Sequence, residues 1–142
     1  MLKDQLINFL KRKNITFTSD DGFIIFDYAE KKLVVYFNEK DAYYFRLMSP
    51  GLSKVTDVNR NQYCEIINQI NLNYKVGKLS IPNNQVWAFV EQFAYSEENI
   101  DVLFERCINV IVEIINEFND EIKKISDTSM KEESLNKTQK SE

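Results

Sequence analysis

Histidine is absent from the 142-residue chain, and its absence excludes imidazole acid–base catalysis, His-dependent catalytic triads and most zinc sites. Glycine occurs only at Gly22, Gly51 and Gly77, which lie too far apart to form a glycine-rich phosphate loop. The two cysteines, Cys64 and Cys107, lack CxxC spacing, so we expect both to be buried, reduced thiols. The sequence therefore predicts no metal site and no bound cofactor.

Positive charge and long apolar runs are also scarce. Lysine and arginine total 18 against 22 acidic residues, which gives a net charge of −4 and no positive field to hold a phosphate backbone. No apolar run approaches the roughly 20 residues that a membrane span requires, and the N-terminal segment lacks the continuous apolar region of a signal peptide. We therefore expect a cytoplasmic protein that binds neither nucleic acid nor membrane.

The residues that are present indicate one packed domain followed by a tail. Hydrophobic residues make up 44% of the chain and proline occurs only twice, a composition typical of a globular protein of this length. After Ile125 apolar residues nearly vanish. The sequence predicts a domain over residues 1–125 and a flexible polar tail over residues 126–142.

Hydrophobic periodicity predicts an α+β fold with the order α-β-β-β(-β)-α-β-β-α, in which helices pack on an antiparallel sheet. Helical spacing predicts a first helix over residues 2–13. A second helix is capped by Thr56 or Asp57 and ends near residues 71–73. A third begins at Ser96, Glu97 and Glu98 and ends near residue 125. Strand composition marks residues 15–18, 23–28, 33–37, 42–48, 74–81 and 86–93, with Pro50-Gly51 interrupting the pattern after the fourth.

The acidic residues favour structural roles over catalysis. Asp20 and Asp21 precede Gly22, where aspartate suits turn geometry, and Glu97, Glu98 and Asp101 suit the positive end of a helix dipole. The sequence contains no catalytic motif, so we predict that the protein is not an enzyme and has no catalytic residues.

Aromatic residues make up 13% of the chain. Tyr43, Tyr44 and Phe45 beside Arg46 are compatible with a platform on which bases stack, but their strand propensity in an acidic chain favours simple packing within a sheet.

Several predicted strands are apolar on both faces, and this is the strongest functional signal. Val86, Ala88 and Val90 alternate with an equally apolar set, Trp87, Phe89 and Phe93. Three helices can hardly cover both faces of such a sheet, so part of it is expected to meet another protein or a second copy of the chain. Our candidate for this surface is Trp87, Phe89 and Phe93; the alternative is that these residues pack under the third helix.

Residues 65–71 (EIINQIN), 74–81 (YKVGKLSI) and 85–93 (QVWAFVEQF) resemble the YbjN family, bacterial proteins classed among sensory transduction regulators. Its marker residues here include Asn68, Asn71 and Glu91, for which we expect structural roles, with the asparagine side chains bonding backbone groups in the turn at the helix end. The resemblance implies a fold similar to class I type III secretion chaperones, small acidic dimers that bind extended segments of client proteins.

These observations lead to a functional hypothesis with two alternatives. The preferred one is a non-enzymatic protein-binding module with a regulatory or chaperone-like outcome, acting on another protein or as a homodimer. The first alternative is a dedicated secretion chaperone that binds an effector segment. The second, a small ligand-binding domain or an enzyme, requires a polar pocket that the sequence does not predict.

Overall fold

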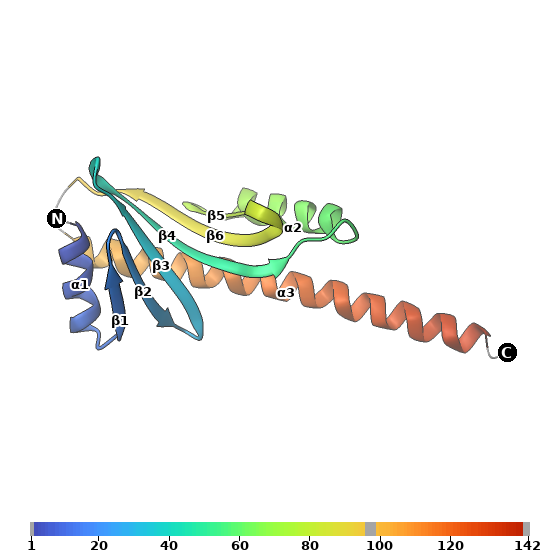
Figure 1. The fold of residues 1–142 in the computed structure, drawn as a ribbon. Helices are drawn as coiled ribbons and strands as arrows, with labels where there is room; N and C mark the ends of the chain where they lie inside the picture. Colours follow the sequence, from blue (N-terminus) through green and yellow to red (C-terminus); the bar gives the residue numbers. More distant parts are fainter. Residues whose placement is uncertain (1, 96–98, 141–142) are drawn as a thin grey trace.

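Three α-helices and six strands make up the part of the chain that this computed structural model describes, residues 2–95 and 99–140 (Figure 1). The fold is α+β, as predicted. The elements in chain order are α1 (Leu2–Arg12), β1 (Phe17–Asp20), β2 (Phe23–Tyr28), β3 (Lys31–Asn38), β4 (Asp41–Lys54), α2 (Arg60–Asn73), β5 (Gly77–Ser80), the 3-10 turn η1 (Pro82–Asn84), β6 (Gln85–Phe93) and α3 (Ile100–Lys140).

The strands form a single antiparallel sheet in the order β1-β2-β3-β4-β6-β5. The first four strands make the predicted meander, in which the turn after β1 places Gly22 at a φ of 76°, a value that glycine adopts without strain. The last two strands form a hairpin whose inner strand, β6, pairs with β4. This arrangement makes β1 and β5 the two edges of the sheet.

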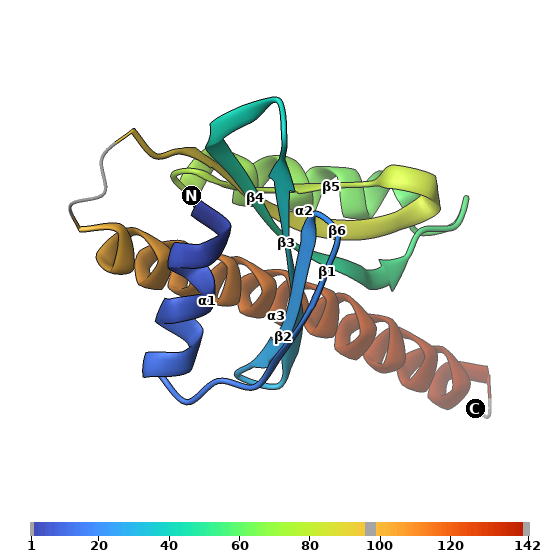
Figure 2. The ribbon, with the colours of Figure 1, turned by 60° about the vertical axis from the view of Figure 1, so that its left-hand side comes forward.

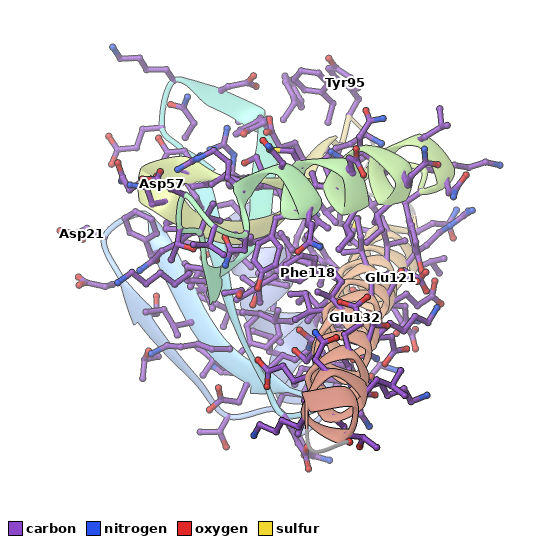
Figure 3. The ribbon with its side chains drawn as sticks, turned by 90° about the vertical axis from the view of Figure 1, so that its right-hand side faces the viewer. Asp21, Asp57, Tyr95, Phe118, Glu121 and Glu132 are labelled. Atoms are coloured by element: carbon purple, nitrogen blue, oxygen red, sulfur yellow. The ribbon has the colours of Figure 1, made fainter. Side chains whose placement is uncertain are left out.

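All three helices lie on one face of the sheet, as the views in Figures 2 and 3 show. The predicted apolar stripe of α3 runs through the core, where Ile111 and Phe118 are fully buried. The Phe104 ring contacts the rings of Phe9 in α1 and Phe45 in β4, with centroid distances of 6.0 and 5.3 Å. Phe118 lies between α2, α3 and the sheet (Figure 3), and Tyr63 of α2 meets its ring edge-on. The core is therefore one layer between the helices and the sheet.

Strand β4 does not stop at Pro50-Gly51, contrary to the prediction. It continues to Lys54 through a bulge, because Ser49 pairs with Ala88 and Ser53 with Val86, so that four steps along β4 match two along β6. A bulge tolerates a proline because its residues leave the hydrogen-bond ladder, and Gly51 supplies a φ of 66°. The predicted break is thus an irregularity inside one long strand.

Helix α3 continues to Lys140, although the sequence predicts a tail from residue 126. Residues 126–140 contain neither glycine nor proline, and helix-compatible residues can extend an existing helix at little cost. The described side chains of residues 126–138 are all exposed, so the extension adds nothing to the core. The flexibility of residues 126–142 stays a prediction. At the other end of α3, the predicted caps Ser96, Glu97 and Glu98 lie outside the described residues.

Other boundaries shift by a few residues. Helix α2 begins at Arg60 and not beside Thr56 or Asp57, because Thr56 and Asn59 first close a turn in which the Asn59 Oδ1 accepts from the Thr56 N–H at 2.8 Å. Strand β5 begins at Gly77 because Val76, with a φ of 68°, interrupts the extended backbone.

Candidate functional site

The sheet face that is turned away from the helices is the candidate functional site; we call it the open face. Antiparallel partners point to the same side, so the strand register gives its composition directly. One apolar row crosses four neighbouring strands and is flanked by polar residues at both edges. Its members, from β1 to β5, are Thr18, Ile25, Val34, Met48, Phe89 and Lys78.

Aromatic side chains surround this row. The Phe23 and Tyr36 rings on β2 and β3 lie 5.5 Å apart, and Trp87 and Phe89 on β6 stack at 5.9 Å. Phe93, at the end of β6, is 56% exposed and Phe23 is 39% exposed, whereas the core phenylalanines are almost fully buried. An apolar surface of this kind, rimmed by polar residues, is typical of protein-interaction sites.

A compact polar cluster lies in the middle of the open face. The Arg46 guanidinium pairs with the Glu91 carboxylate at 3.2 Å and donates from Nε to the Tyr44 hydroxyl at 3.1 Å. The Tyr44 hydroxyl donates to the other Glu91 oxygen at 3.1 Å. Arg46 also lies 5.4 Å from the centre of the Phe89 ring, within cation–π range. The charges of this cluster therefore compensate one another within the face.

Burial is the main reason why the pKa of Tyr44 is raised above its ordinary value; the neighbouring Arg46 opposes the shift and Glu91 adds to it. Tyr44 therefore stays protonated at neutral pH and keeps its hydroxyl donor for Glu91. The arrangement can hold the open face in one shape, because its polar groups find their partners within the cluster.

The three residues predicted as a partner surface lie together on the open face. Trp87 and Phe89 are half-buried and Phe93 is exposed, while the intervening Val86, Ala88 and Val90 are completely buried beneath the helices. The alternative, that Trp87 and Phe89 pack under α3, is wrong because these side chains point to the opposite side of β6. Their role in binding stays a prediction.

The three marker residues lie in different environments. Asn71 in the last turn of α2 bonds the backbone of a strand and not that of the turn: its Nδ2 donates to the Leu79 carbonyl at 3.0 Å and its Oδ1 accepts from the Leu79 N–H at 2.8 Å. Asn68 is exposed on α2, and Glu91 belongs to the polar cluster of the open face. Asn71 therefore ties α2 to the outer side of β5.

The two thiols differ, so one half of the cysteine prediction is wrong. Cys107 is buried in α3, and the loss of solvation raises its pKa to about 11. Cys64 is exposed because the buried stripe of α2 consists of Tyr63, Ile67 and Ile70, and Cys64 lies beside that stripe. Among the described residues no group of three or more cysteine or acidic side chains is placed to hold a metal ion.

The acidic residues considered for catalysis are dispersed. Asp20 is the last residue of β1 and Asp21 begins the turn to β2, where the Asp20 carboxylate accepts from the Asp21 N–H at 2.7 Å. Asp101, at the start of α3, forms an ion pair with Arg12 at the end of α1 and so joins two helices. Glu97 and Glu98 lie outside the described residues.

The four residues considered as a stacking platform do not share a face. Phe45 is buried under the helices, whereas Tyr44 and Arg46 belong to the open face. Tyr43 instead contacts Tyr95 just beyond the end of β6, at a ring distance of 5.1 Å.

Sequence reasoning missed the polar cluster of Tyr44, Arg46 and Glu91, since only the pairing of β4 with β6 reveals it.

The fold and the open face define a class: a small α+β protein whose sheet is covered by helices on one side only. The chain belongs to the YbjN family, whose model, described as "Putative bacterial sensory transduction regulator", matches residues 2–124. Comparison with curated proteins gives no match. Within residues 2–95 and 99–140, no helix is both long and apolar enough to cross a membrane.

Solved structures share the fold, among them the two that follow. The crystal structure of YbjN from E. coli, described as "a putative transcription regulator", matches with a TM-score of 0.63 at 11% identity, covering 82% of this chain and 90% of that chain. The crystal structure of an uncharacterized protein from Methanothermobacter thermautotrophicus matches with a TM-score of 0.59 at 10% identity, covering 84% of this chain and 98% of that chain. At these identities the likeness concerns the fold alone.

Proposed function

We propose that the chain is a non-enzymatic protein-binding module that acts in the cytoplasm and holds a partner chain on the open face of its sheet. The observation that carries this proposal is the apolar row across four strands, which the helices leave uncovered. The partner is another protein or a second copy of this chain, and the outcome is regulatory or chaperone-like. The description of the YbjN family as regulators supports this class of function.

Covering the open face with a partner removes apolar surface from water. Apolar surface contributes about 25 cal/mol for each Å² removed from water, and a specific interface needs roughly 800 Å² on each partner. Charges in the centre of an interface usually oppose binding, because removing a charge from water is costly and most costly where no opposite charge compensates it. For Arg46 and Glu91 part of this cost is offset, because they already pair with each other and with Tyr44. The open face can therefore be covered without stranding a charge.

Phe93→Glu is the variant that tests the proposal. Its side chain is 56% exposed, so the substitution should leave the fold intact while placing a carboxylate on the interaction surface. Leu72→Glu is the matched control: it introduces the same charge at an apolar position on α2 that is 76% exposed and lies away from the open face. Circular dichroism of both variants verifies that they fold.

Sedimentation velocity over a range of protein concentrations measures self-association. If the partner is a second copy, the wild type and Leu72→Glu form dimers while Phe93→Glu stays monomeric. If the wild type is a monomer, the three proteins serve as baits for co-purification with mass spectrometry of the retained proteins. A partner lost only with Phe93→Glu supports the proposal. The proposal fails if the wild type neither self-associates nor retains a partner, or if both variants behave alike.

A further inference from the structure

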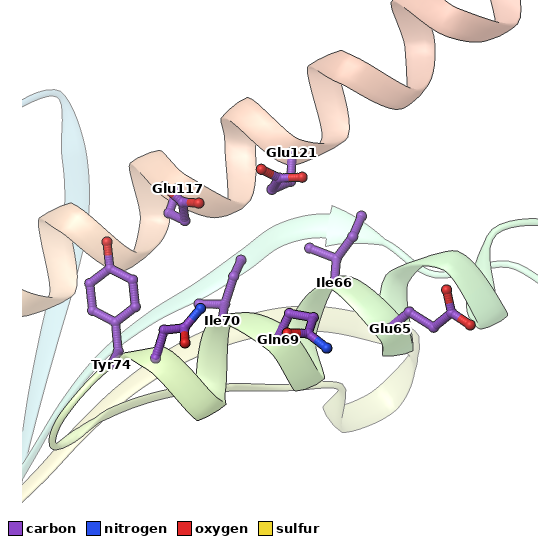
Figure 4. A pocket seen from close by; sticks show the side chains of 8 residues that line it. Glu65, Ile66, Gln69, Ile70, Tyr74, Glu117 and Glu121 are labelled. Carbon is purple, nitrogen blue, oxygen red and sulfur yellow. The ribbon is translucent and has the colours of Figure 1, made fainter.

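A groove of about 530 Å³ lies between α2 and α3, on the side of the molecule away from the open face. Figure 4 shows the two helices with the lining side chains between them. Tyr63 near the start of α2 contacts Phe118, whereas Tyr74 at its end reaches the backbone of Glu113, so the helices run in opposite directions. The residues that line the groove are Glu65, Ile66, Gln69, Ile70, Asn73, Tyr74, Glu117 and Glu121.

The floor of the groove is an apolar stripe along α2. Ile66 and Ile70 are four residues apart on one side of the helix, and Tyr74, the residue that caps its end, lines the groove beyond them. Eight residues of helix rise about 12 Å, so the stripe is elongated along the helix axis. Ile66 is half-buried at the groove, while Ile70 is 4% exposed beneath it. The shape suits an elongated ligand with an apolar side.

The rims of the groove carry negative charge. Glu117 and Glu121 lie one helical turn apart on α3, Glu65 lies on α2 beside Ile66, and no lysine or arginine is among the lining residues. Lys124, which does not line the groove, pairs with Glu121 at 2.9 Å. Because the Lys124 side chain is 72% exposed, water screens this pair and it offsets the charge of Glu121 only in part. The pKa of Tyr74 is raised, first by burial and then by the nearby carboxylates of Glu117 and Glu113. The groove thus has a negative potential over an apolar floor.

We propose that the α2–α3 groove binds a positively charged amphipathic helix of a partner protein. Leucine-like side chains at helical spacing would cover Ile66, and lysine or arginine side chains on the flanks would meet Glu65, Glu117 and Glu121. A helix fits better than a small polyamine, which would satisfy the carboxylates but leave the isoleucine floor exposed to water. The proposal does not depend on the open face and gives the molecule a second binding side.

The probe is a fluorescently labelled helical peptide that has leucines at i, i+4 and i+7, lysines on both flanks and a length of about 14 residues, or roughly 20 Å. The wild type should bind it saturably in a titration followed by fluorescence anisotropy. The double variant Glu65→Gln/Glu117→Gln should bind about tenfold more weakly, a loss equivalent to about 1.4 kcal/mol. The control Glu132→Gln/Glu133→Gln removes the same charge from the exposed extension of α3 and should bind within about twofold of the wild type.

Two further measurements locate the binding and test its apolar part. Amide chemical-shift changes should concentrate at Ile66, Ile70 and Glu117, and not at Val34 or Met48 on the open face. A scrambled peptide with the same charge but dispersed leucines should bind clearly more weakly. The proposal is overturned if the wild type does not saturate, if both double variants weaken binding equally, if the scrambled peptide or spermine binds as well as the probe, or if the shifts map to the open face.

Discussion

Replacing Asn71 by alanine should destabilise the fold because this one side chain holds two backbone groups of strand β5. Its amide donates to the Leu79 carbonyl and accepts from the Leu79 N–H, so both polar groups of Leu79 are satisfied by the last turn of α2. In the Asn71→Ala variant these partly buried groups lose their partners. The variant therefore tests how strongly β5 is attached to the helix layer.

The size of the effect follows from two opposing terms. Each intramolecular hydrogen bond contributes about 1 kcal/mol net, and a partly buried group left without a partner costs somewhat more. Alanine also has a higher helix propensity than asparagine, which returns about 0.5 kcal/mol or less in the last turn of a helix. We expect a net loss of about 2 kcal/mol in the free energy of unfolding.

Asn68→Ala is the matched control, because Asn68 lies one turn earlier on α2 and is exposed. It gains the same propensity without losing the bonds to Leu79, so it should be neutral or slightly stabilising. Urea unfolding followed by far-UV circular dichroism should show the Asn71→Ala midpoint about 1 M below that of Asn68→Ala, given typical urea slopes. Midpoints within the experimental error of each other would refute the role assigned to Asn71.

Three other predictions concern the thiols, the C-terminal extension and the core. At pH 8 a thiol of pKa about 11 is ionised in about one molecule in a thousand, so a disulfide reagent should modify Cys64 rapidly and Cys107 only in denaturant; rapid modification of both thiols in the native protein would contradict this burial. Deleting residues 126–142 should move the thermal midpoint by no more than about 2 °C, since the described side chains there are exposed, and a larger drop would show that the extension packs on the body. Ile111→Asp should cost several kcal/mol, because Ile111 is fully buried, and native-like near-UV circular dichroism would disprove its place in the core.

The sequence predicts the helices and strands well because hydrophobic periodicity depends only on residues that are close together in the chain. The stripe of α3 and the alternation in β6 specify which side chains share a face before any tertiary contact is known. In β6, however, both faces are apolar, so alternation separates Val90 from Phe89 without telling which one the helices cover. That choice depends on the order of the strands and the packing of α3.

The candidate site depends on register, and register is not a local property. Arg46 meets Glu91 only because β4 pairs with β6 in a particular alignment, which shifts at the bulge between Ser49 and Ser53. A pattern that treats Pro50 as the end of the strand cannot yield this alignment. The same holds for Asn71, whose type of bond is predictable while its partner, Leu79 on the next strand, comes from the tertiary fold.

The hydrogen bonds between Asn71 and Leu79 also affect whether a strand of a second molecule can pair with the β5 edge of the sheet. The Leu79 N–H and carbonyl on the outer side of β5 are taken by Asn71, and the neighbouring Gly77 N–H donates to the Lys75 carbonyl, so this edge offers few free groups to another strand. Joining β1 of one molecule to β5 of the next would build an open-ended ribbon, whereas joining β1 to β1 closes after two molecules. A single amide on a helix thereby occupies edge groups that such an open-ended ribbon would need.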